Sequence, residues 1–270
     1  GCLYLPKDNT KFRDFDFKNQ LDELMELGLD GIKICDFKPD AYKLFNLDAH
    51  LEQYDEFLGY CEKNNVHMCW HVADPDFFWD ESKLPRELVE RGWCYGDPSY
   101  AHYDEIERQA YTIFEAYPNL KVTLAHFFFY GECPKKLDAL FEKYPNLCVD
   151  ITPGCEMYHS FEKNHNYYKD FFRRNSDRIL IGTDGTFPWE TKGHVWCLDI
   201  LYRFIATDDK MMAFDDSILT GLAIDGEKKE NILYKNFERR VGSEPKPVNK
   251  SALKRYVDKY MYLLNDEERA

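Results

Sequence analysis

Two histidines and one aspartate stand at the ends of three separate apolar runs, and these residue types could together bind a metal ion. His71 lies near the end of the first run, His126 directly follows the second, and Asp184 ends the third. Each run has the length and composition of a buried β-strand. Because parallel strands present their carboxyl ends at one edge of a sheet, we expect the three side chains to converge on one metal-centred site.

The alternation of side chains places His71 on the inward face of its strand. Within residues 66–72, His67, Cys69 and His71 alternate with apolar residues and therefore share one face. Pro75 follows shortly afterwards, and proline cannot continue a central strand ladder. His67 lies near the start of the strand and is predicted to be structural, whereas His71 lies at its tip.

Imidazole and carboxylate groups are the ligands that a catalytic zinc ion prefers, with one position left open for water. His71, His126 and Asp184 are therefore the predicted metal ligands. Asp184 could also accept a proton from the water, whose pKa a metal lowers toward about 7. His126 could instead hold the water or a substrate oxygen. The predicted catalytic residues are Asp184 and His126. One such histidine alone is more often a packing residue, but the pattern occurs three times.

Alternating strands and helices must position these residues. The expected strands are 1–6, 31–35, 66–72, 122–126, 147–152 and 179–184, and the expected helices are 16–27, 51–64, 103–117, 135–143, 169–174, 194–206, 227–241 and 250–264. Near-continuous apolar strands that alternate with helices predict a parallel sheet of the α/β class, here a TIM-barrel-like (β/α) barrel. An open doubly wound sheet is the competing architecture, but it usually brings a glycine-rich phosphate turn, which the sequence lacks.

Composition narrows the partners and the surroundings. The chain has 270 residues and a net charge of −14, which argues against nucleic acid or an anionic membrane surface as the partner. Nine scattered cysteines without Cys-x-x-Cys spacing predict free thiols in the cytoplasm. No apolar run approaches the roughly 18 residues of a membrane span, and no signal-peptide pattern opens the chain. A small-molecule substrate is the expected partner, and homo-oligomerisation stays open.

The residues around the three strand ends resemble the amidohydrolase superfamily, and within it amidohydrolase family 2, which includes decarboxylases and lactonases. The resemblance rests on the runs ending in His71, His126 and Asp184, on residues 148–151, and on residues 231–239. It covers most of residues 1–242, so we expect a barrel domain over 1–242 and a helical tail over 243–270. It implies a distorted TIM barrel with His71 on the fifth strand, and a divalent metal, usually zinc, with manganese or iron as alternatives.

The chain departs from this family in one respect. The family's first strand ends in a His-x-His pair that supplies two ligands, and no His-x-His occurs in the sequence. Counting back from His71 as strand five leaves strands one and two absent. Such a barrel would expose two long ladder edges, which proteins avoid. We therefore expect that the sequence begins inside a longer chain, or that another segment or subunit fills the gap.

Lys33 and Asp150 are the predicted substrate contacts. Lys33 alternates with Ile32 and Ile34, so its side chain is expected to point into the barrel, where it would bind a substrate carboxylate or phosphate. Pairing with an inward carboxylate such as Asp150 is an equally supported alternative. Asp150 stands at a strand tip of its own. Lys38, on the following loop, is predicted to be solvated.

Three functions remain open at this point. The first is a metal-dependent hydrolase that cleaves a C–N, C–O or lactone bond in a small, carboxylate-bearing substrate through a metal-activated water. A related non-oxidative decarboxylase would use the same site. The third is a barrel without catalytic activity that binds a small molecule or a partner, which the missing His-x-His pair supports.

Overall fold

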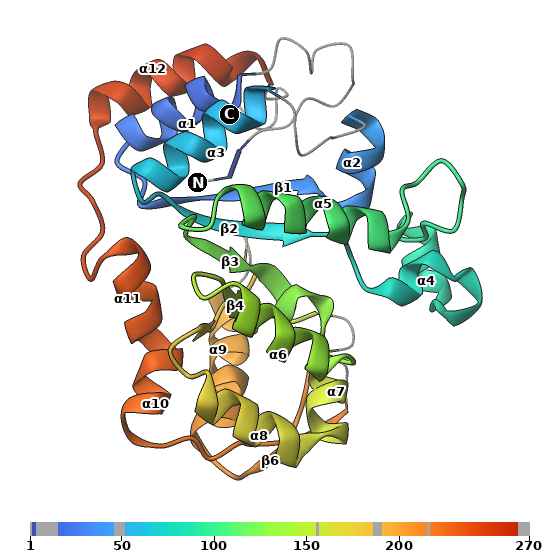
Figure 1. Ribbon diagram of the computed structural model, residues 1–270. Coiled ribbons are helices and arrows are strands. Elements are labelled where there is room, and N and C mark those ends of the chain that lie inside the picture. The colour runs from blue at the N-terminus through green and yellow to red at the C-terminus, as the bar shows by residue number, and fades with distance from the viewer. Residues whose placement is uncertain are drawn as a thin grey trace.

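A parallel sheet forms the centre of the molecule. The computed structural model describes residues 2–3, 16–45, 52–154, 157–185, 191–214 and 217–263. Within them the sheet has the strand order β1-β2-β3-β4-β5, so strands that follow one another in the chain are also neighbours in space (Figure 1). Every neighbouring pair is parallel, with helices in the connections. This is the arrangement that a (β/α) barrel requires.

The strands become shorter along the sheet. They are β1 (Gly31–Phe37), β2 (His67–Val72), β3 (Val122–Leu124), β4 (Cys148–Asp150) and β5 (Ile179–Leu180). All residues of β3, β4 and β5 are buried, as expected for strands that are covered on both faces. A separate antiparallel hairpin consists of β6 (Lys210–Met212) and β7 (Ile218–Thr220).

Helices surround the sheet. They are α1 (Phe17–Glu26), α2 (Pro39–Phe45), α3 (Glu52–Lys63), α4 (Arg86–Glu90), α5 (Tyr103–Ala116), α6 (Pro134–Lys143), α7 (Met157–Lys163), α8 (His165–Arg174), α9 (Thr191–Ala206), α10 (Gly226–Glu230), α11 (Asn236–Val241) and α12 (Lys250–Tyr260). In Figure 1, α1, α3 and α12 stack together on the β1 side of the sheet, and α4 projects beside the carboxyl ends of β1 and β2.

Helix α1 shows how local signals select these elements. The Asp16 side chain accepts a hydrogen bond from the Asn19 amide at 2.8 Å and so caps the first turn. Phe17, Leu21 and Leu24 recur at helical spacing and are buried against the core. The predicted helix over residues 16–27 is thereby confirmed.

Helix α12 lies against α1 rather than apart from the barrel. The Arg255 guanidinium contacts the Glu26 carboxylate at 2.6 Å, and the Asn249 amide donates to the Leu27 carbonyl at 3.1 Å. Ala252 is buried at this contact. The predicted boundary at residue 242 falls directly after α11, and the division of the chain there stays a prediction.

Both outer strands have partners for part of their length. The Leu3 amide donates to the Lys33 carbonyl at 3.0 Å, next to a parallel bridge between Cys2 and Lys33. The expected first strand is thus present at residues 2–3, and its remaining residues lie outside the described ones. On the other edge, the Asn236 amide side chain donates to the Ile179 carbonyl at 2.7 Å.

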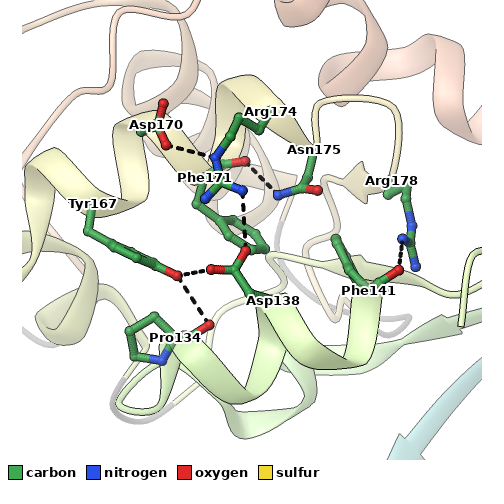
Figure 2. Close-up of polar contacts among 9 residues, drawn as sticks. All are labelled: Pro134, Asp138, Phe141, Tyr167, Asp170, Phe171, Arg174, Asn175 and Arg178. Carbon is green, nitrogen blue, oxygen red and sulfur yellow. Dashed lines mark hydrogen bonds and ion pairs between the residues drawn. The ribbon is translucent and has the colours of Figure 1, made fainter. Parts of the chain in front are cut away.

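Polar contacts join α6 to α8 (Figure 2). The Tyr167 hydroxyl donates to the Asp138 carboxylate and, at 3.3 Å, to the Pro134 carbonyl. Arg174 donates to Asp170 at 2.7 Å and to Asp138 at 3.4 Å. Of the two ion pairs, the one with Asp138 joins the helices and the one with Asp170 lies within α8. Exposed pairs of this kind contribute little, about 0–1 kcal/mol each.

Two arginines close the amino ends of the strands. The Arg178 guanidinium, just before β5, donates to the carbonyls of Phe141, Tyr144 and Leu147 at 2.6–2.8 Å; Figure 2 shows the bond to Phe141. Arg240 donates to the Val122 and Asn146 carbonyls. The planar guanidinium suits this task because it carries several donors in one fork.

Some elements differ from the expectation. Helices α2 and α7 and the β6–β7 hairpin were not predicted, and the expected helix over 227–241 is divided into α10, a π-turn at Asn231–Lys235 and α11. The strand expected over 122–126 ends at Leu124, because the chain enters a turn at Ala125–Phe129. The fold class itself is confirmed: the chain is an incomplete TIM barrel with a helical extension.

Cysteine chemistry agrees with the sequence analysis. All cysteines among the described residues are free thiols. In the same part of the chain, none of the helices combines the length and the apolar character that crossing a membrane requires. A cytoplasmic location stays a prediction.

Candidate functional site

A cavity of about 340 Å³ opens at the carboxyl ends of the strands. Its wall takes residues from every strand end: Lys38 after β1, His71 at the end of β2, His126 after β3, Pro153 and Gly154 after β4, and Asp184 after β5. This volume is in the range of small-molecule sites, roughly 300–1,000 Å³. The cavity therefore has the location and the size of a barrel active site.

The three predicted metal ligands line this one cavity. The imidazole rings of His71 and His126 meet edge to face with their centroids 4.9 Å apart. Both residues are buried, with 7% and 6% of their surface exposed, whereas Asp184 is exposed at the rim. The structure thus brings together residues that are more than 50 positions apart in sequence.

A buried carboxylate orients His71. The Asp74 side chain lies 3.1 Å from Nε2 of His71 and accepts a second hydrogen bond, of 2.7 Å, from the Tyr95 hydroxyl. Burial lowers the pKa of His71 to about 4, although the hydrogen bond to Asp74 works in the opposite direction. The ring is therefore neutral near pH 7. Because an ionised carboxylate only accepts, Nε2 carries the proton and Nδ1 keeps a lone pair.

Asp74 is ionised in this arrangement. Burial alone would raise the pKa of its carboxyl group, but the hydrogen bonds from His71 and Tyr95 and the charge of Lys38 lower it on balance. A carboxylate behind a histidine fixes the orientation and the tautomer of the ring, as in many metal and catalytic sites.

His126 is held through its backbone and its ring. Its amide donates to Oδ1 of Asp150 at 2.9 Å, and its Nδ1 lies 3.3 Å from the Thr152 carbonyl. A carbonyl oxygen only accepts, so Nδ1 carries a proton, and Nε2 is the ring nitrogen left for another partner. In each of the two histidines, the nitrogen that is not engaged in this hydrogen bond is thus the one that can bind a metal ion.

The turn after β3 has an unusual backbone. His126, Phe127, Phe128 and Phe129 have φ angles of 53–59°, in the left-handed region. This region costs a residue with a side chain about 1–2 kcal/mol. Phe127 and Phe128 offset the strain because both rings are buried in the hydrophobic core. The turn thereby directs the His126 side chain into the cavity.

Similar strain occurs beside the other predicted ligands. Ala73, two residues after His71, has a φ of 59°, and Asp184 has a φ of 50°. Left-handed residues other than glycine therefore accompany all three strand ends that carry a predicted ligand. Such strain tends to cluster at functional sites, where the surrounding structure holds it in place.

Aromatic rings form the apolar part of the wall. The Phe129 ring centroid lies 5.4 Å from the ring centroids of both His71 and His126. Phe78 and Trp93 are stacked, with centroids 6.3 Å apart. A cavity with flat apolar walls and a few polar groups suits a small organic molecule.

Lys33 and Asp150 lie outside this wall. Lys33 points into the barrel, and its ammonium lies 3.6 Å from the Cys69 sulfur. Burial lowers the pKa of Lys33, but the nearby Cys69, Cys35, Asp150 and Asp184 raise it on balance. Asp150 accepts the amides of His126 and Thr152. The substrate contacts predicted for both residues stay predictions.

Lys38 lines the cavity, which the sequence analysis did not foresee. Its side chain is 32% exposed and lies 3.8 Å from the Asp74 carboxylate, so it is half-buried rather than fully solvated. One signal could have identified it: Lys38 directly follows a strand end, as the other site residues do.

The types of donor atom on this wall fit a divalent metal ion, but among the described residues too few donors lie close together to hold one. Two imidazoles and a carboxylate on the same wall are suitable ligand types for zinc or manganese. Yet among the residues that the structure describes, no three His, Cys, Asp or Glu side chains are gathered closely enough to hold an ion. The metal site predicted from His71, His126 and Asp184 thus stays a prediction.

Comparison with known proteins finds likeness in structure alone. No family model and no curated protein sequence matches the chain. An uncharacterised TIM-barrel protein from Bordetella bronchiseptica matches 88% of this chain with a TM-score of 0.50 and 15% identity, and 64% of its own length is covered. A putative amidohydrolase from Staphylococcus aureus matches 83% of this chain, with 68% of its own length covered, a TM-score of 0.50 and 16% identity.

A third similar structure is a 2,6-dihydroxybenzoate decarboxylase from Rhizobium, with a TM-score of 0.48 and 18% identity over 83% of this chain and 66% of that one. At such identities the first two matches show the fold and nothing further. The chain spans about two thirds of the length of the structures it matches. Its fold is that of a TIM barrel, of which it contains a part.

Proposed function

We propose that the protein is a metal-dependent hydrolase of the amidohydrolase type that acts on a small carboxylate-bearing substrate. The observation that carries the proposal is the meeting of two histidines and an aspartate in one cavity at the carboxyl ends of parallel strands. The S. aureus neighbour described as a putative amidohydrolase is consistent with it. A bound divalent metal would supply a water of lowered pKa and polarise the bond to be cleaved.

The side chains of the chain itself have separate tasks in this proposal. His71, His126 and Asp184 would hold the metal, and Asp184, which lies at the exposed rim, would accept a proton. Asp74 and the Thr152 carbonyl keep the two imidazoles in the tautomers that leave a lone pair available. Lys33 and Asp150 contact the substrate from below the cavity wall.

Metal binding is the first test. Protein purified without chelators should contain about one equivalent of zinc, manganese or iron, and the protein after chelator treatment should take up one equivalent in a calorimetric titration. His71→Ala and His126→Ala should each lower the affinity by at least about tenfold. His159→Ala is the matched control, because His159 is an exposed histidine outside the cavity. Less than about a tenth of an equivalent in the wild type would contradict the proposal.

Asp184→Asn tests the proposed base. The amide keeps the side-chain volume but cannot take a proton, so kcat should fall by about a hundredfold or more. The free energy of unfolding should change by less than about 0.5 kcal/mol, because the residue is exposed. Turnover is measured on a panel of carboxylate-bearing amides, esters and lactones. Full activity in this variant would exclude the assigned role.

A barrel that binds a ligand without catalysis is the second candidate. It is favoured by the absence, among the described side chains, of a group of three metal donors. The metal titration separates the two functions, since a binder needs no metal. A decarboxylase would use the same residues, and release of carbon dioxide in the substrate panel distinguishes it from a hydrolase.

A further inference from the structure

The backbone of Lys38 is fixed at the mouth of the cavity. Its amide donates to the Cys35 carbonyl at 3.2 Å, and its carbonyl accepts the Tyr42 amide at 2.8 Å. Lys38 therefore joins the end of β1 to the start of α2, with Pro39 as the first residue of the helix. Such a junction leaves only the side chain free to move.

The ammonium group of Lys38 has few partners. Its nearest carboxylate oxygen, on Asp74, is 3.8 Å away, which is longer than a hydrogen bond, and that carboxylate already accepts from His71 and Tyr95. The Trp93 ring centroid is 5.8 Å from Nζ, close to the limit of about 6 Å for a cation–π contact. Within the described part of the chain, its three N–H donors are thus left for a ligand.

Trp93 is held in place by the end of α4. Gly92 has a φ of 81° and donates to the Val89 carbonyl at 2.9 Å, and the Trp93 amide donates to the Leu88 carbonyl at 2.9 Å. These are the two bonds of a Schellman motif, which ends a helix with glycine in the left-handed conformation. The ring also stacks on Phe78, and the Arg91 guanidinium lies 5.6 Å from its centroid.

The positive charge of Lys38 determines whether the cavity can accept an anionic ligand. The other ionised groups on the cavity wall are the carboxylates of Asp74 and Asp184, and the chain as a whole carries a charge of −14. Without Lys38, these carboxylates would repel an anion. An ammonium with unused donors close to flat aromatic walls is complementary to a carboxylate attached to a flat apolar group.

We propose that Lys38 is the specificity-determining residue of this cavity and that it selects a carboxylate, with the Trp93 ring holding the ammonium group at the mouth. The inference rests on the proposed function in one respect, the use of the same cavity. It adds the residue that recognises the charge of the ligand. The carboxylate displaces Lys38 from its long contact with Asp74 and accepts its hydrogen bonds.

The test compares benzoate with benzamide, which have the same shape but differ in charge. Binding is measured by calorimetry on chelator-treated protein, so that a metal ion cannot itself attract the carboxylate. The wild type should bind benzoate about tenfold or more tighter than benzamide, the preference expected for a charge-assisted hydrogen bond. Equal affinities would overturn the proposal.

Lys38→Met keeps the apolar stem and removes the charge, so the ratio of the two affinities should fall to about one. Lys43→Met is the matched control, because Lys43 lies on α2 with its ammonium 3.8 Å from the Tyr100 ring, outside the cavity. It should keep the wild-type ratio. A preference for benzoate that survives in Lys38→Met would contradict the proposal, and the ratio is insensitive to a general loosening of the cavity.

Repeating the measurement with added zinc separates this proposal from the proposed function. Benzoate selectivity that depends on Lys38 in a protein that binds no metal would refute the hydrolase and support the role of Lys38. A protein that binds metal and is active, but whose benzoate selectivity does not depend on Lys38, would support the hydrolase and refute the role of Lys38.

Discussion

The two ends of the parallel sheet are built from the same kinds of residue but use them differently. At the amino ends, Arg178 donates to three main-chain carbonyls and Arg240 to two. At the carboxyl ends, Lys38 has no comparable partner among the described residues, and its nearest carboxylate is 3.8 Å away. One end uses its cations to close the structure, and the other leaves its cation for a ligand.

Backbone conformation differs in the same direction. Non-glycine residues with positive φ lie at the carboxyl ends of β2, β3 and β5, at Ala73, His126–Phe129 and Asp184. The amino ends have only Asn65 of this kind among the described residues close to a strand start. The difference agrees with the usual arrangement of barrels, in which one end of the strands contributes stability and the other carries the active site.

Removing one cation from each end of the sheet should have the largest effect, because the two losses of stability are expected to differ. Arg178→Met should lower the free energy of unfolding by about 3 kcal/mol, because three carbonyls lose their donor. Lys38→Met should change it by less than about 0.5 kcal/mol. Urea denaturation of both variants gives the two values. Similar losses in the two variants would show that the ends do not differ.

His67 makes the amino end sensitive to acid. It is the first residue of β2, and its Nε2 lies 2.9 Å from the Thr123 hydroxyl. Burial lowers its pKa from 6.5 to about 3, so the folded state resists protonation. The contribution of neutral His67 to the free energy of unfolding is fully present above pH 6.5. It is lost as the pH falls toward 3, by about 3 kcal/mol at pH 4.

His67→Gln should remove this part of the pH dependence while keeping a polar partner for Thr123. The measurement is the free energy of unfolding at pH 7 and pH 4 in both proteins. If the variant and the wild type lose equal stability between these values, His67 is not the source of the acid sensitivity.

Asp36 should have the opposite effect near the carboxyl end of β1. Its Oδ1 accepts from the Trp70 indole at 2.9 Å, while Oδ2 is buried without a partner among the described residues. Burial raises its pKa from 3.8 to about 7, so the folded state holds the proton more tightly than the unfolded state. Stability therefore falls as the pH rises from about 4 through 7.

Asp36→Asn keeps an acceptor for Trp70 and cannot ionise. It should stabilise the protein by on the order of 2 kcal/mol at pH 8 and have little effect at pH 4. Denaturation at the two pH values tests this. A gain of equal size at both would point to packing rather than ionisation.

Replacing either of two glycines should have the smallest effect on stability, and the two changes should have opposite signs. Gly92→Ala should cost about 1 kcal/mol, because alanine is strained at a φ of 81° although nothing lies within 4 Å of the added methyl group. Gly193→Ala, inside α9 and equally open, should gain about 0.5–1 kcal/mol. Thermal unfolding measures both, and benzoate selectivity should fall only in Gly92→Ala, which displaces Trp93.

The sequence was sufficient to predict the parallel sheet and the location of His71 and His126 at its strand ends. The strand expected over 179–184 ends at Leu180, so Asp184 lies in the loop after it. Alternating apolar runs and helices determine that order, and the carboxyl ends of parallel strands then meet by geometry. The same reasoning assigned His67 to the start of its strand, and its buried contact with Thr123 fits a structural role.

Other features had no local signal. The left-handed turn at His126–Phe129 consists of residues that normally avoid this conformation, and only the packing of Phe127 and Phe128 makes it stable. Short elements such as α2, α7 and the β6–β7 hairpin depend on tertiary contacts more than on propensity. Lys38 became visible as a site residue only when the cavity was present.

The left-handed turn also bears on how a ligand would be captured. The rings of Phe127 and Phe128 are buried in the core before any ligand binds. The segment that carries His126 and Phe129 therefore loses little conformational entropy when a complex forms. The entropic penalty of association then falls on the incoming molecule and on the four-carbon arm of Lys38. Such preorganisation favours rapid encounter over slow rearrangement, with the mobile arm as the single adjusting part.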